Sequence, residues 1–389
     1  MYGGDLTMKI FADKNILALE TYFSRHGELH FFDGRKVKQA DLVEADALIV
    51  RSITDVNESL LAGTKIRFLG TATSGIDHID TAYLHDAGIH FEDAKGCNAN
   101  AVVDYCFTAL AYAELHRGFS LSGSRVGIVG AGAVGGLFAA KLEKLAVEVR
   151  RCDPFLSENG AESMGEGSGY CSLEEALDCD VISLHVPLTI NGPHPTRNLL
   201  GAAELTALRK GAMLINACRG CVVDEAALKQ VLAERKDIIS VFDVWAGEPV
   251  IDSSLAELVD IATPHIAGYS AEAKSNATKI LARGFEEHFR LGIAAEEGDE
   301  GETLSPVTLQ CAAEALGPWK TLLAAFPLDK LSEQFKQALK EGKGAETFDS
   351  FRKELLQRRE FESRLLKRAA YSALQQKQLS VLGFVFEKS

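Results

Sequence analysis

Short apolar runs alternate with helical patterns from residue 8 to about residue 92. The strands expected there are residues 10–12, 29–32, 47–50, 68–70 and 89–91. Alternation of strands with helices is typical of a parallel sheet that carries helices on its faces. The pattern therefore predicts a first α/β domain over residues 8–100.

A long apolar helix comes next and leads into a second alternation. The stretch 101–115 contains neither Gly nor Pro, and Asn98 or Asn100 is placed to cap it. The apolar strand 125–129 then precedes a helix whose apolar residues recur at helical spacing. Further strands are expected at residues 147–149, 181–186, 212–216, 238–242 and 261–263, with a helix at 224–234. We expect a second α/β domain over residues 101–270.

The last hundred residues follow a different pattern. Residues 296–302 are acidic and contain glycine, which is typical of a linker. The segment beyond is mostly helical, and the apolar run 381–386 is expected to form an edge strand. The fold class expected is α/β: two Rossmann-like, doubly wound parallel-sheet domains plus a small, mostly helical C-terminal α+β domain over residues 291–389. Self-association is its expected role, with binding of a regulatory ligand as the alternative.

Composition excludes several classes of protein. The 389 residues are 47% hydrophobic and 25% charged, as in ordinary soluble globular proteins. No apolar stretch is long enough for a membrane span and no signal peptide is evident, so a cytoplasmic location is expected. The net charge of −14 opposes binding to nucleic acid or to an anionic membrane. Any anionic substrate must therefore be held by local cations.

The eight cysteines are scattered through apolar and helical patterns, so we expect reduced thiols and no disulfide framework. Cys218 and Cys221 have the spacing of zinc knuckles and redox pairs, but no second pair accompanies them. No histidine shows metal-ligand spacing either. We interpret the cysteine pair as coincidence and predict no metal site.

A glycine motif at residues 130–135 is the first candidate for chemistry. A strand precedes it, a helix follows it, and Asp153 ends the next strand, as the dinucleotide-binding fingerprint requires. The first glycine allows a tight turn, the second a close approach of the pyrophosphate, and the third close packing of helix on strand. The helix N-terminus adds amide donors and partial positive charge. The cofactor contacts predicted here are Gly130, Gly132, Ala133, Val134, Gly135 and Asp153.

The identity of the cofactor depends on Asp153. Its carboxylate can accept hydrogen bonds from both ribose hydroxyls and would repel a 2′-phosphate, which favours NAD over NADP. Arg150 and Arg151 keep NADP as an alternative, but they precede the acid and we interpret them as strand residues.

Three polar residues follow three buried strands of the second domain. Arg219 comes after strand 212–216, Glu248 after strand 238–242, and His265 after strand 261–263. In an open parallel sheet, the strand ends on one side form the ligand crevice. Each residue alone has an ordinary interpretation, as a surface ion pair, a turn and a core histidine. Their joint position behind a nucleotide site instead predicts a catalytic group of cation, acid and imidazole.

In order and spacing, residues 8–290 resemble the D-isomer-specific 2-hydroxyacid dehydrogenase family. The resemblance implies that residues 271–290 return to the first domain. A narrower resemblance rests on the segments 50–54 (VRSIT) and 70–78 (GTATSGIDH), on Tyr269 and on the length of the C-terminal extension. It implies a small phosphorylated hydroxy acid, 4-phospho-D-erythronate, as the substrate, and 2-oxo-3-hydroxy-4-phosphobutanoate as the product, in vitamin B6 synthesis.

The chemistry of the three residues fits a hydroxy-acid oxidation. The planar guanidinium of Arg219 can bind a carboxylate through two hydrogen bonds. Imidazole has an ordinary pKa of about 6.5, so His265 can take the C2 hydroxyl proton and return it in the reverse direction. Glu248 would hold the ring in the right tautomer and stabilise the imidazolium.

The resemblance extends to further positions around this group. Ser52, Thr73 and Tyr269 resemble substrate-binding positions, and Arg51 is a candidate for the substrate phosphate, with a salt bridge as the alternative. Val186 departs from the family, since close relatives often carry threonine there. Positions near the nicotinamide are expected at Ala217, Cys218, Asp243 and Gly268.

Other functions remain open at this point. The rival enzyme is a dehydrogenase for another 2-hydroxy acid, such as 3-phosphoglycerate, with formate dehydrogenase less favoured because its acid position is usually glutamine. An NAD-sensing, corepressor-like binding protein would keep the same three residues, so only turnover would distinguish it. The extra domain and the resemblance predict a homodimer, since twofold assemblies are the commonest.

Overall fold

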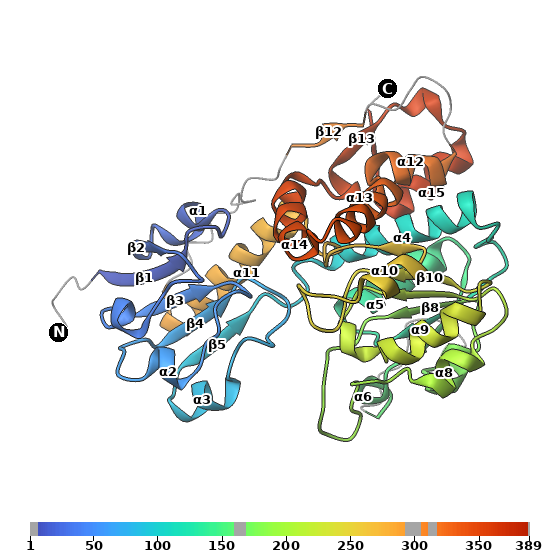
Figure 1. Cartoon of the computed structure of the whole chain (residues 1–389). Coiled ribbons are helices and arrows are strands. Elements are labelled where there is room, and N and C mark those ends of the chain that lie inside the picture. The colour runs from blue at the N-terminus through green and yellow to red at the C-terminus, as the bar shows by residue number, and fades with distance from the viewer. Residues whose placement is uncertain (1–6, 159–168, 292–304, 310–316, 388–389) are drawn as a thin grey trace. The chain divides into compact units, whose positions relative to one another are not determined.

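The computed structural model describes residues 7–158, 169–291, 305–309 and 317–387. Within these ranges the strands form sheets of five, six and three strands, and all of the strand pairs are parallel (Figure 1). The chain divides into two compact units. Unit 1 contains the described residues of 1–98 and 271–304, and unit 2 those of 99–270 and 305–389.

Unit 1 is built on the five-stranded sheet, whose order is β2-β1-β3-β4-β5. Its strands are β1 (Met8–Asp13), β2 (Gly27–Phe32), β3 (Ala47–Val50), β4 (Phe68–Thr71) and β5 (His90–Asp93). Its helices are α1 (Leu19–Phe23), α2 (Glu58–Leu61), α3 (Thr81–Asp86) and α11 (Ala271–Phe289). All five strands predicted for this part of the chain are present.

The central strand β3 shows why an unbroken apolar run forms a strand here. Ala47 and Ile49 pack in one core together with residues of α1 and α11, whereas Leu48 and Val50 pack in another with residues of α2 and α3. Alternate side chains of a strand point to opposite faces, so a strand covered on both faces needs apolar residues at every position. The sheet is therefore a buried layer between two layers of helices.

Unit 2 is built on the six-stranded sheet, whose order is β11-β10-β9-β8-β6-β7. Its strands are β6 (Arg125–Val129), β7 (Glu148–Cys152), β8 (Val181–Leu184), β9 (Met213–Asn216), β10 (Ile239–Phe242) and β11 (Ile261–Ala262). The chain winds from β6 to β7 on one side and later adds β8 on the other. A ligand crevice is expected at the carboxyl ends of strands where the order reverses in this way.

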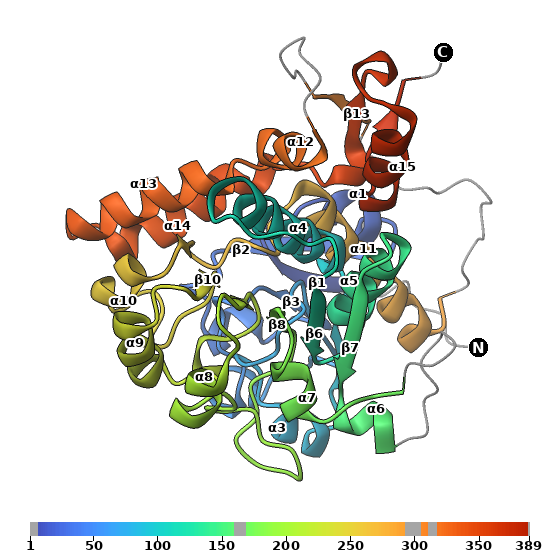
Figure 2. The same cartoon turned by 90° about the vertical axis from the view of Figure 1, so that its right-hand side faces the viewer.

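Helices cover both faces of this sheet. One face carries α4 (Ala99–His116) and α5 (Ala133–Lys144), and the other carries α7 (Leu173–Leu177), α8 (Ala202–Ala207), α9 (Glu225–Glu234) and α10 (Ser253–Leu258) (Figures 1 and 2). The short α6 (Pro154–Glu158) follows β7. Among the helices of the described ranges, none combines the length and apolar character that crossing a membrane requires.

The C-terminal part of unit 2 is mostly helical, as predicted. It contains β12 (Val307–Thr308), α12 (Pro318–Ala325), α13 (Leu328–Lys340), α14 (Gly344–Glu354), β13 (Arg364–Leu366), α15 (Ala373–Leu382) and β14 (Val385–Phe386). The strand expected at residues 381–386 is shorter than predicted, because α15 continues to Leu382 and ends at Gly383 with a φ of 119°. The linker expected at residues 296–302 lies outside the described residues. With two parallel sheets and this helical part, the predicted fold class is confirmed.

The C-terminal segment shares its hydrophobic cores with the six-stranded sheet. Leu322 and Phe326 pack in the same core as α4 and α5, and Phe335 and Phe348 pack in the core on the opposite face of the sheet. In Figure 2, α13 and α14 lie near α10, where α13 also packs against β11. The segment from residue 305 onward therefore belongs to the same compact unit as the glycine motif.

Residues 358–361 hold this segment to two parts of unit 2. Arg358 Nη2 donates to the carbonyl oxygens of Ala101 at 2.8 Å and Ala267 at 3.3 Å. The backbone N–H of Phe361 donates to Asp104 Oδ2 at 2.8 Å, and Glu360 accepts from the Ser270 hydroxyl at 2.6 Å. The segment is thus tied both to the start of α4 and to the stretch that follows His265.

Candidate active site

The glycine loop joins β6 to α5 at the point where the strand order reverses. Gly130 has a φ of 90°, and its N–H donates to the carbonyl oxygen of Cys152 at 2.8 Å. A Cβ atom on Gly130 would lie 2.6 Å from the carbonyl oxygen of His185, in the turn that follows β8. Both the left-handed backbone and the close approach require glycine at this position.

The other two glycines of the motif have opposite surroundings. A Cβ atom on Gly135 would lie 1.9 Å from the carbonyl oxygen of Gly130, so the helix packs directly on the loop. A Cβ atom on Gly132 would have no atom within 4 Å, and Gly132 is the N-cap of α5. Open space beside a helix N-terminus suits the phosphates of a dinucleotide. The loop therefore has the close packing at Gly135 and the open space at Gly132 that a dinucleotide-binding turn requires.

Asp153 lies directly beside this loop. Its Oδ2 accepts a hydrogen bond from the N–H of Ala131 at 2.9 Å, and its Oδ1 accepts from the N–H of Leu156 at 3.1 Å. Arg150 and Arg151 are strand residues, as interpreted, and their guanidinium groups pair with Glu148 and Glu143, respectively. The acid that would meet a ribose is therefore fixed in place, and both neighbouring arginines already have a carboxylate partner.

The three predicted catalytic residues lie in loops after neighbouring strands. Arg219 follows β9, Glu248 follows β10 and His265 follows β11, and these strands are adjacent in the sheet. Because parallel strands end at the same edge, the three loops emerge on one side. The candidate site of unit 2 is this edge together with the glycine loop.

Glu248 and His265 form a hydrogen-bonded pair. His265 Nδ1 lies 2.8 Å from Glu248 Oε2, and the other carboxylate oxygen accepts the N–H of Trp245 at 2.9 Å. A carboxylate only accepts hydrogen bonds, so the proton is assigned to Nδ1, which leaves Nε2 as the basic nitrogen. Arg352 Nη2 lies 3.4 Å from the same Oε2.

The surroundings of Glu248 keep its carboxylate ionised. Burial is the largest single influence and raises its pKa. The hydrogen bond and charge of His265, the N–H of Trp245 and the charge of Arg352 lower the pKa, and their sum exceeds the effect of burial. The net effect is a pKa below the ordinary value. An ionised partner is what a histidine needs to hold its Nδ1 proton and to become positively charged during proton transfer.

His265 sits in a strained turn that a buried aspartate holds. Its φ is 56°, a left-handed conformation that is uncommon for residues other than glycine. Asp243, which is fully buried, accepts hydrogen bonds from the N–H groups of Ile266 and Ala267, both at 2.8 Å, and from the Thr263 hydroxyl at 2.6 Å. Its carbonyl oxygen accepts the N–H of His265 at 2.7 Å. Asp243 therefore shapes the turn that presents the imidazole.

The loop of Arg219 packs against the loop of Glu248. A Cβ atom on Gly220 would lie 2.0 Å from the carbonyl carbon of Trp245, so only glycine fits next to Arg219. Arg219 Nη1 donates to the carbonyl oxygen of Cys218 at 2.7 Å. Asn216, at the end of β9, donates through Nδ2 to the carbonyl oxygen of Arg219 at 3.1 Å. The backbone that carries the guanidinium is thus held on two sides.

Trp245 connects the three loops, and sequence reasoning did not assign it a role. It packs on Gly220, its N–H binds Glu248, and its indole Nε1 donates to the carbonyl oxygen of Thr263 at 2.9 Å. In the sequence, Trp245 stands between two predicted site residues, Asp243 and Glu248, and this position was the available signal.

The remaining predicted positions of unit 2 surround the same edge. Ala217 and Cys218 directly precede Arg219, and burial raises the pKa of the Cys218 thiol to about 11, so it stays protonated at neutral pH. Gly268 and Tyr269 follow the His265 turn. The guanidinium of Arg352 lies 5.8 Å from the centre of the Tyr269 ring. Arg352 was missed because no motif or spacing links residue 352 to these loops.

In unit 1, the predicted substrate residues also follow adjacent strands. Ser52 is exposed after β3, and Thr73 follows β4, where its hydroxyl donates to the carbonyl oxygen of Gly75 at 2.9 Å. Arg51 Nη2 lies 3.0 Å from Oδ2 of Asp13, whose side chain is fully buried. The salt bridge considered as the alternative for Arg51 is therefore present.

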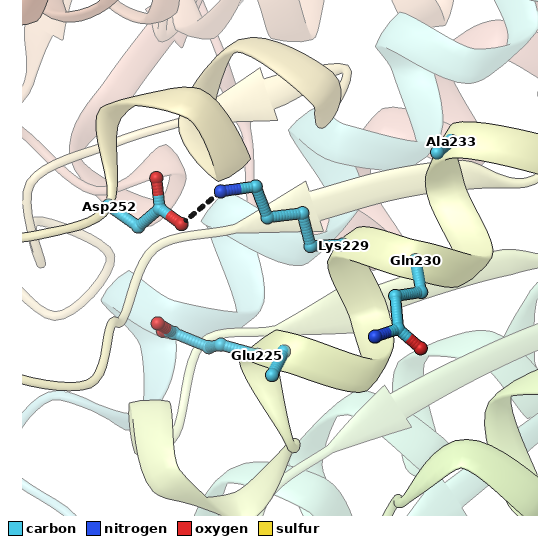
Figure 3. A pocket seen from close by; sticks show the side chains of 6 residues that line it. Glu225, Lys229, Gln230, Ala233 and Asp252 are labelled. Carbon is cyan, nitrogen blue, oxygen red and sulfur yellow. Dashed lines mark hydrogen bonds and ion pairs between the residues drawn. The ribbon is translucent and has the colours of Figure 1, made fainter.

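A separate surface hollow lies between α9 and α10. Figure 3 shows its lining side chains and the ion pair that Lys229 Nζ forms with Asp252 Oδ2 at 2.6 Å. None of the predicted site residues lines it. Glu225 at its edge accepts the N–H of Ala246 at 2.6 Å, so it supports the Glu248 loop from outside.

Comparison with known proteins agrees with this geometry. Residues 108–267 match the family described as "D-isomer specific 2-hydroxyacid dehydrogenase, NAD binding domain". The erythronate-4-phosphate dehydrogenase of Pseudomonas putida is 41% identical over 91% of this chain and 93% of its own length. The enzyme of the same name from Cellvibrio japonicus is 40% identical over 97% of this chain and 99% of its own.

Solved structures show the same fold. The NAD⁺-bound 3-phosphoglycerate dehydrogenase of Entamoeba histolytica matches with a TM-score of 0.62 and 26% identity, covering 74% of this chain and 96% of its own. The NAD-bound formate dehydrogenase of Staphylococcus aureus matches with a TM-score of 0.57 and 24% identity, covering 72% and 96%. The predicted NAD cofactor is confirmed by the NAD-binding family match. The chain therefore belongs to the D-isomer-specific 2-hydroxyacid dehydrogenase family and, within it, to the erythronate-4-phosphate dehydrogenases.

Proposed function

We propose that this chain oxidises the C2 hydroxyl of 4-phospho-D-erythronate to give 2-oxo-3-hydroxy-4-phosphobutanoate, a step of pyridoxal phosphate (vitamin B6) synthesis. The observation that carries the proposal is the 2.8 Å hydrogen bond between His265 Nδ1 and Glu248 Oε2. This hydrogen bond leaves Nε2 of His265 as the basic nitrogen. It also gives the imidazolium, once formed, an ionised partner in Glu248. The names of the relatives support the choice of substrate.

His265, Glu248 and Arg219 form the proposed catalytic group. Arg219 binds the substrate carboxylate through its planar guanidinium, which orients C2 for reaction. His265 Nε2 takes the hydroxyl proton, and Glu248 stabilises the imidazolium while its hydrogen bond prevents the ring from turning. Bound NAD⁺ would supply the acceptor for the hydride that leaves C2. The reverse reaction returns the proton from His265 to the carbonyl oxygen.

The cofactor is proposed to lie along the carboxyl edge of the six-stranded sheet. The open space at Gly132 and the N–H groups at the start of α5 suit the pyrophosphate, and Asp153 suits the adenosine ribose. The other proposed contacts of the adenosine and pyrophosphate half are Gly130, Ala133, Val134 and Gly135. The proposed contacts of the nicotinamide half are Ala217, Cys218, Asp243 and Gly268.

The substrate is proposed to contact Ser52, Thr73 and Tyr269 through their hydroxyl groups. Arg51 is also retained as a candidate for the phosphate, although its Nη2 is already paired with the buried Asp13. A guanidinium can bind a second anion through its remaining N–H groups. Replacing Arg51 should therefore raise the KM for phosphorylated substrates selectively if it serves this role.

The protein is further proposed to act in the cytoplasm as a homodimer. Exposed apolar side chains on the C-terminal segment support self-association, including Val307 at 41%, Leu374 at 67% and Val385 at 41% exposure. Light scattering of the purified chain measures the oligomeric state directly, and a monomeric mass at micromolar concentration would contradict the dimer.

Absorbance of NADH tests the reaction and the substrate together. The chain is incubated with NAD⁺ and either 4-phospho-D-erythronate or 3-phospho-D-glycerate, and we expect turnover of the first to exceed that of the second by about 100-fold or more. The matched variant His265→Asn should lose turnover by about 10³-fold while the Kd for NAD⁺ stays unchanged. Preference for 3-phospho-D-glycerate would contradict the substrate. Tight NAD⁺ binding without turnover of either acid would support the corepressor-like alternative.

A further inference from the structure

Arg352 reaches the catalytic pair from the C-terminal segment. It lies on α14, and its Nη2 is 3.4 Å from Glu248 Oε2, the same oxygen that His265 Nδ1 contacts at 2.8 Å. Its guanidinium also lies 5.8 Å from the ring centre of Tyr269, which directly follows the His265 turn. A residue far away in sequence thus meets both the Glu248 loop and the segment after His265.

We propose that Arg352 is a positioning residue for this reaction, holding the Glu248 carboxylate in the orientation that pairs with His265. The inference rests on the proposed function, because it acts through Glu248 and His265 as the proton-transfer pair. A 3.4 Å contact is long for a hydrogen bond, so we assign Arg352 a charge that orients the carboxylate rather than a tight bond.

The helix that carries Arg352 is held in place by packed aromatic side chains. One turn before it on α14, Phe348 is 1% exposed and meets Phe335 of α13 edge to face, with ring centres 5.5 Å apart. The guanidinium lies 5.4 Å from the Phe348 ring, so the side chain is held against a fixed aromatic surface. Only 23% of the Arg352 side chain is exposed, and its buried Nε has no acceptor among the described residues. Among the described residues, the carboxylate that Arg352 contacts is that of Glu248.

The charges around the pair determine how Arg352 affects proton transfer. Glu248 faces His265 directly, Asp243 lies buried beneath the His265 turn, and Glu225 lies behind the Glu248 loop. Arg352 is the cation in contact with Glu248 and offsets part of this negative charge. Burial raises the pKa of Glu248, whereas His265, the N–H of Trp245 and the charge of Arg352 lower it. Without Arg352, its positive charge would no longer offset the carboxylate of Glu248. The carboxylate would then stabilise the imidazolium form of His265 more strongly than it does in the wild type.

The test compares Arg352→Gln, Arg352→Lys and the matched control Lys353→Gln, which removes an exposed positive charge from the next position of α14. In Arg352→Gln, we expect kcat to fall by about 10-fold to 100-fold, whereas the KM for the hydroxy acid stays within about 3-fold. The acid limb of the kcat/KM profile should move to higher pH by about half a unit or more, because oxidation needs neutral imidazole. Arg352→Lys should restore the position of the limb, and Lys353→Gln should resemble the wild type.

Three outcomes would overturn the proposal. A KM raised about 10-fold with an unmoved pH limb would make Arg352 a substrate contact. Kinetics identical to those of Lys353→Gln would leave it without a catalytic role. A loss of activity that Arg352→Lys reproduces fully, with an unmoved limb and a lowered Tm, would make it structural.

A second measurement separates this inference from the proposed function. The assays use whichever hydroxy acid the wild type oxidises, so a wrong substrate does not affect them. NMR titration of the His265 imidazole needs no turnover, and protonation should occur at higher pH in Arg352→Gln than in the wild type. An unchanged titration would contradict the positioning role even if the enzyme oxidises 4-phospho-D-erythronate.

Discussion

The indole Nε1 of Trp245 donates a 2.9 Å hydrogen bond to the carbonyl oxygen of Thr263, which joins the loop of Glu248 to the loop of His265. Trp245→Phe keeps most of the ring packing but leaves this buried carbonyl without its donor. We expect the free energy of unfolding to fall by about 1–3 kcal/mol. Urea denaturation measures this change. We also expect a lower kcat with an unchanged Kd for NAD⁺, and an unchanged kcat would show that the link does not position the catalytic pair.

Gly132 and Gly135 offer a paired test of the glycine loop. A methyl group at Gly135 would lie 1.9 Å from a backbone oxygen, so Gly135→Ala should destabilise the fold by about 3 kcal/mol or more. Gly132 has a φ of −69° and open space around its Cβ position, so Gly132→Ala should change stability by less than about 0.5 kcal/mol. The new methyl would instead occupy space proposed for the pyrophosphate.

Calorimetric titration with NAD⁺ measures that second effect. We expect the Kd of Gly132→Ala to rise by about 10-fold or more, because backbone contact with the pyrophosphate needs a glycine. Thermal melting of both variants serves as the control for folding. An unchanged Kd in a folded Gly132→Ala variant would place the cofactor elsewhere.

Glu248→Gln tests the proposed role of the carboxylate. The amide can still accept a hydrogen bond from Nδ1, but it cannot stabilise the imidazolium with a negative charge. We expect kcat to fall by about 10²-fold to 10⁴-fold. Because the wild-type pKa of Glu248 is below its ordinary value, Glu248 should remain ionised above about pH 5 and should not cause a decline in rate there. Stopped-flow absorbance of NADH measures the rate, and activity near that of the wild type would exclude Glu248 from catalysis.

His185 makes stability depend on pH. Burial lowers its pKa to about 4, whereas an unfolded histidine titrates near 6.5. Between these values the unfolded chain binds a proton that the folded chain does not, so stability is complete above pH 6.5 and is lost as the pH falls toward 4. We expect this group to contribute a loss of about 2–3 kcal/mol over that range.

The variant His185→Gln isolates the contribution of this group. Chemical denaturation at pH 7 and at pH 4.5 gives the change in unfolding free energy for each protein. The wild type should lose about 2 kcal/mol more than the variant over this range. Parallel losses would show that other groups cause the acid sensitivity.

Much of the α/β fold could be predicted from the sequence because its signals are local. The run 47–50 is apolar at every position and forms β3, with the predicted bounds, between two layers of helices. Pattern reasoning failed at residues 381–386, where apolar residues suit both a strand and a buried helix. There, Val381 and Leu382 complete α15, and Leu382 is 1% exposed. Periodicity alone does not separate these alternatives in a short run.

The candidate site, too, could be predicted only in part from the sequence. Arg219, Glu248 and His265 could be predicted because each directly follows a strand of one parallel sheet. Arg352 could not, because its approach depends on how α14 packs, and packing between distant segments leaves no spacing in the sequence. The left-handed conformation of His265 was also hidden, since it is maintained by the buried Asp243 rather than by a glycine.

The cores that the C-terminal segment shares with the six-stranded sheet have a consequence for how the chain tolerates shortening. Phe326 and Phe361 lie in one continuous core with Phe107 and Phe138, so removing the segment would leave large aromatic faces of the coenzyme-binding half in water. Cooperative melting of both parts follows from such a core. Coenzyme added at the glycine loop should therefore protect even the far end of the polypeptide from heat and proteases.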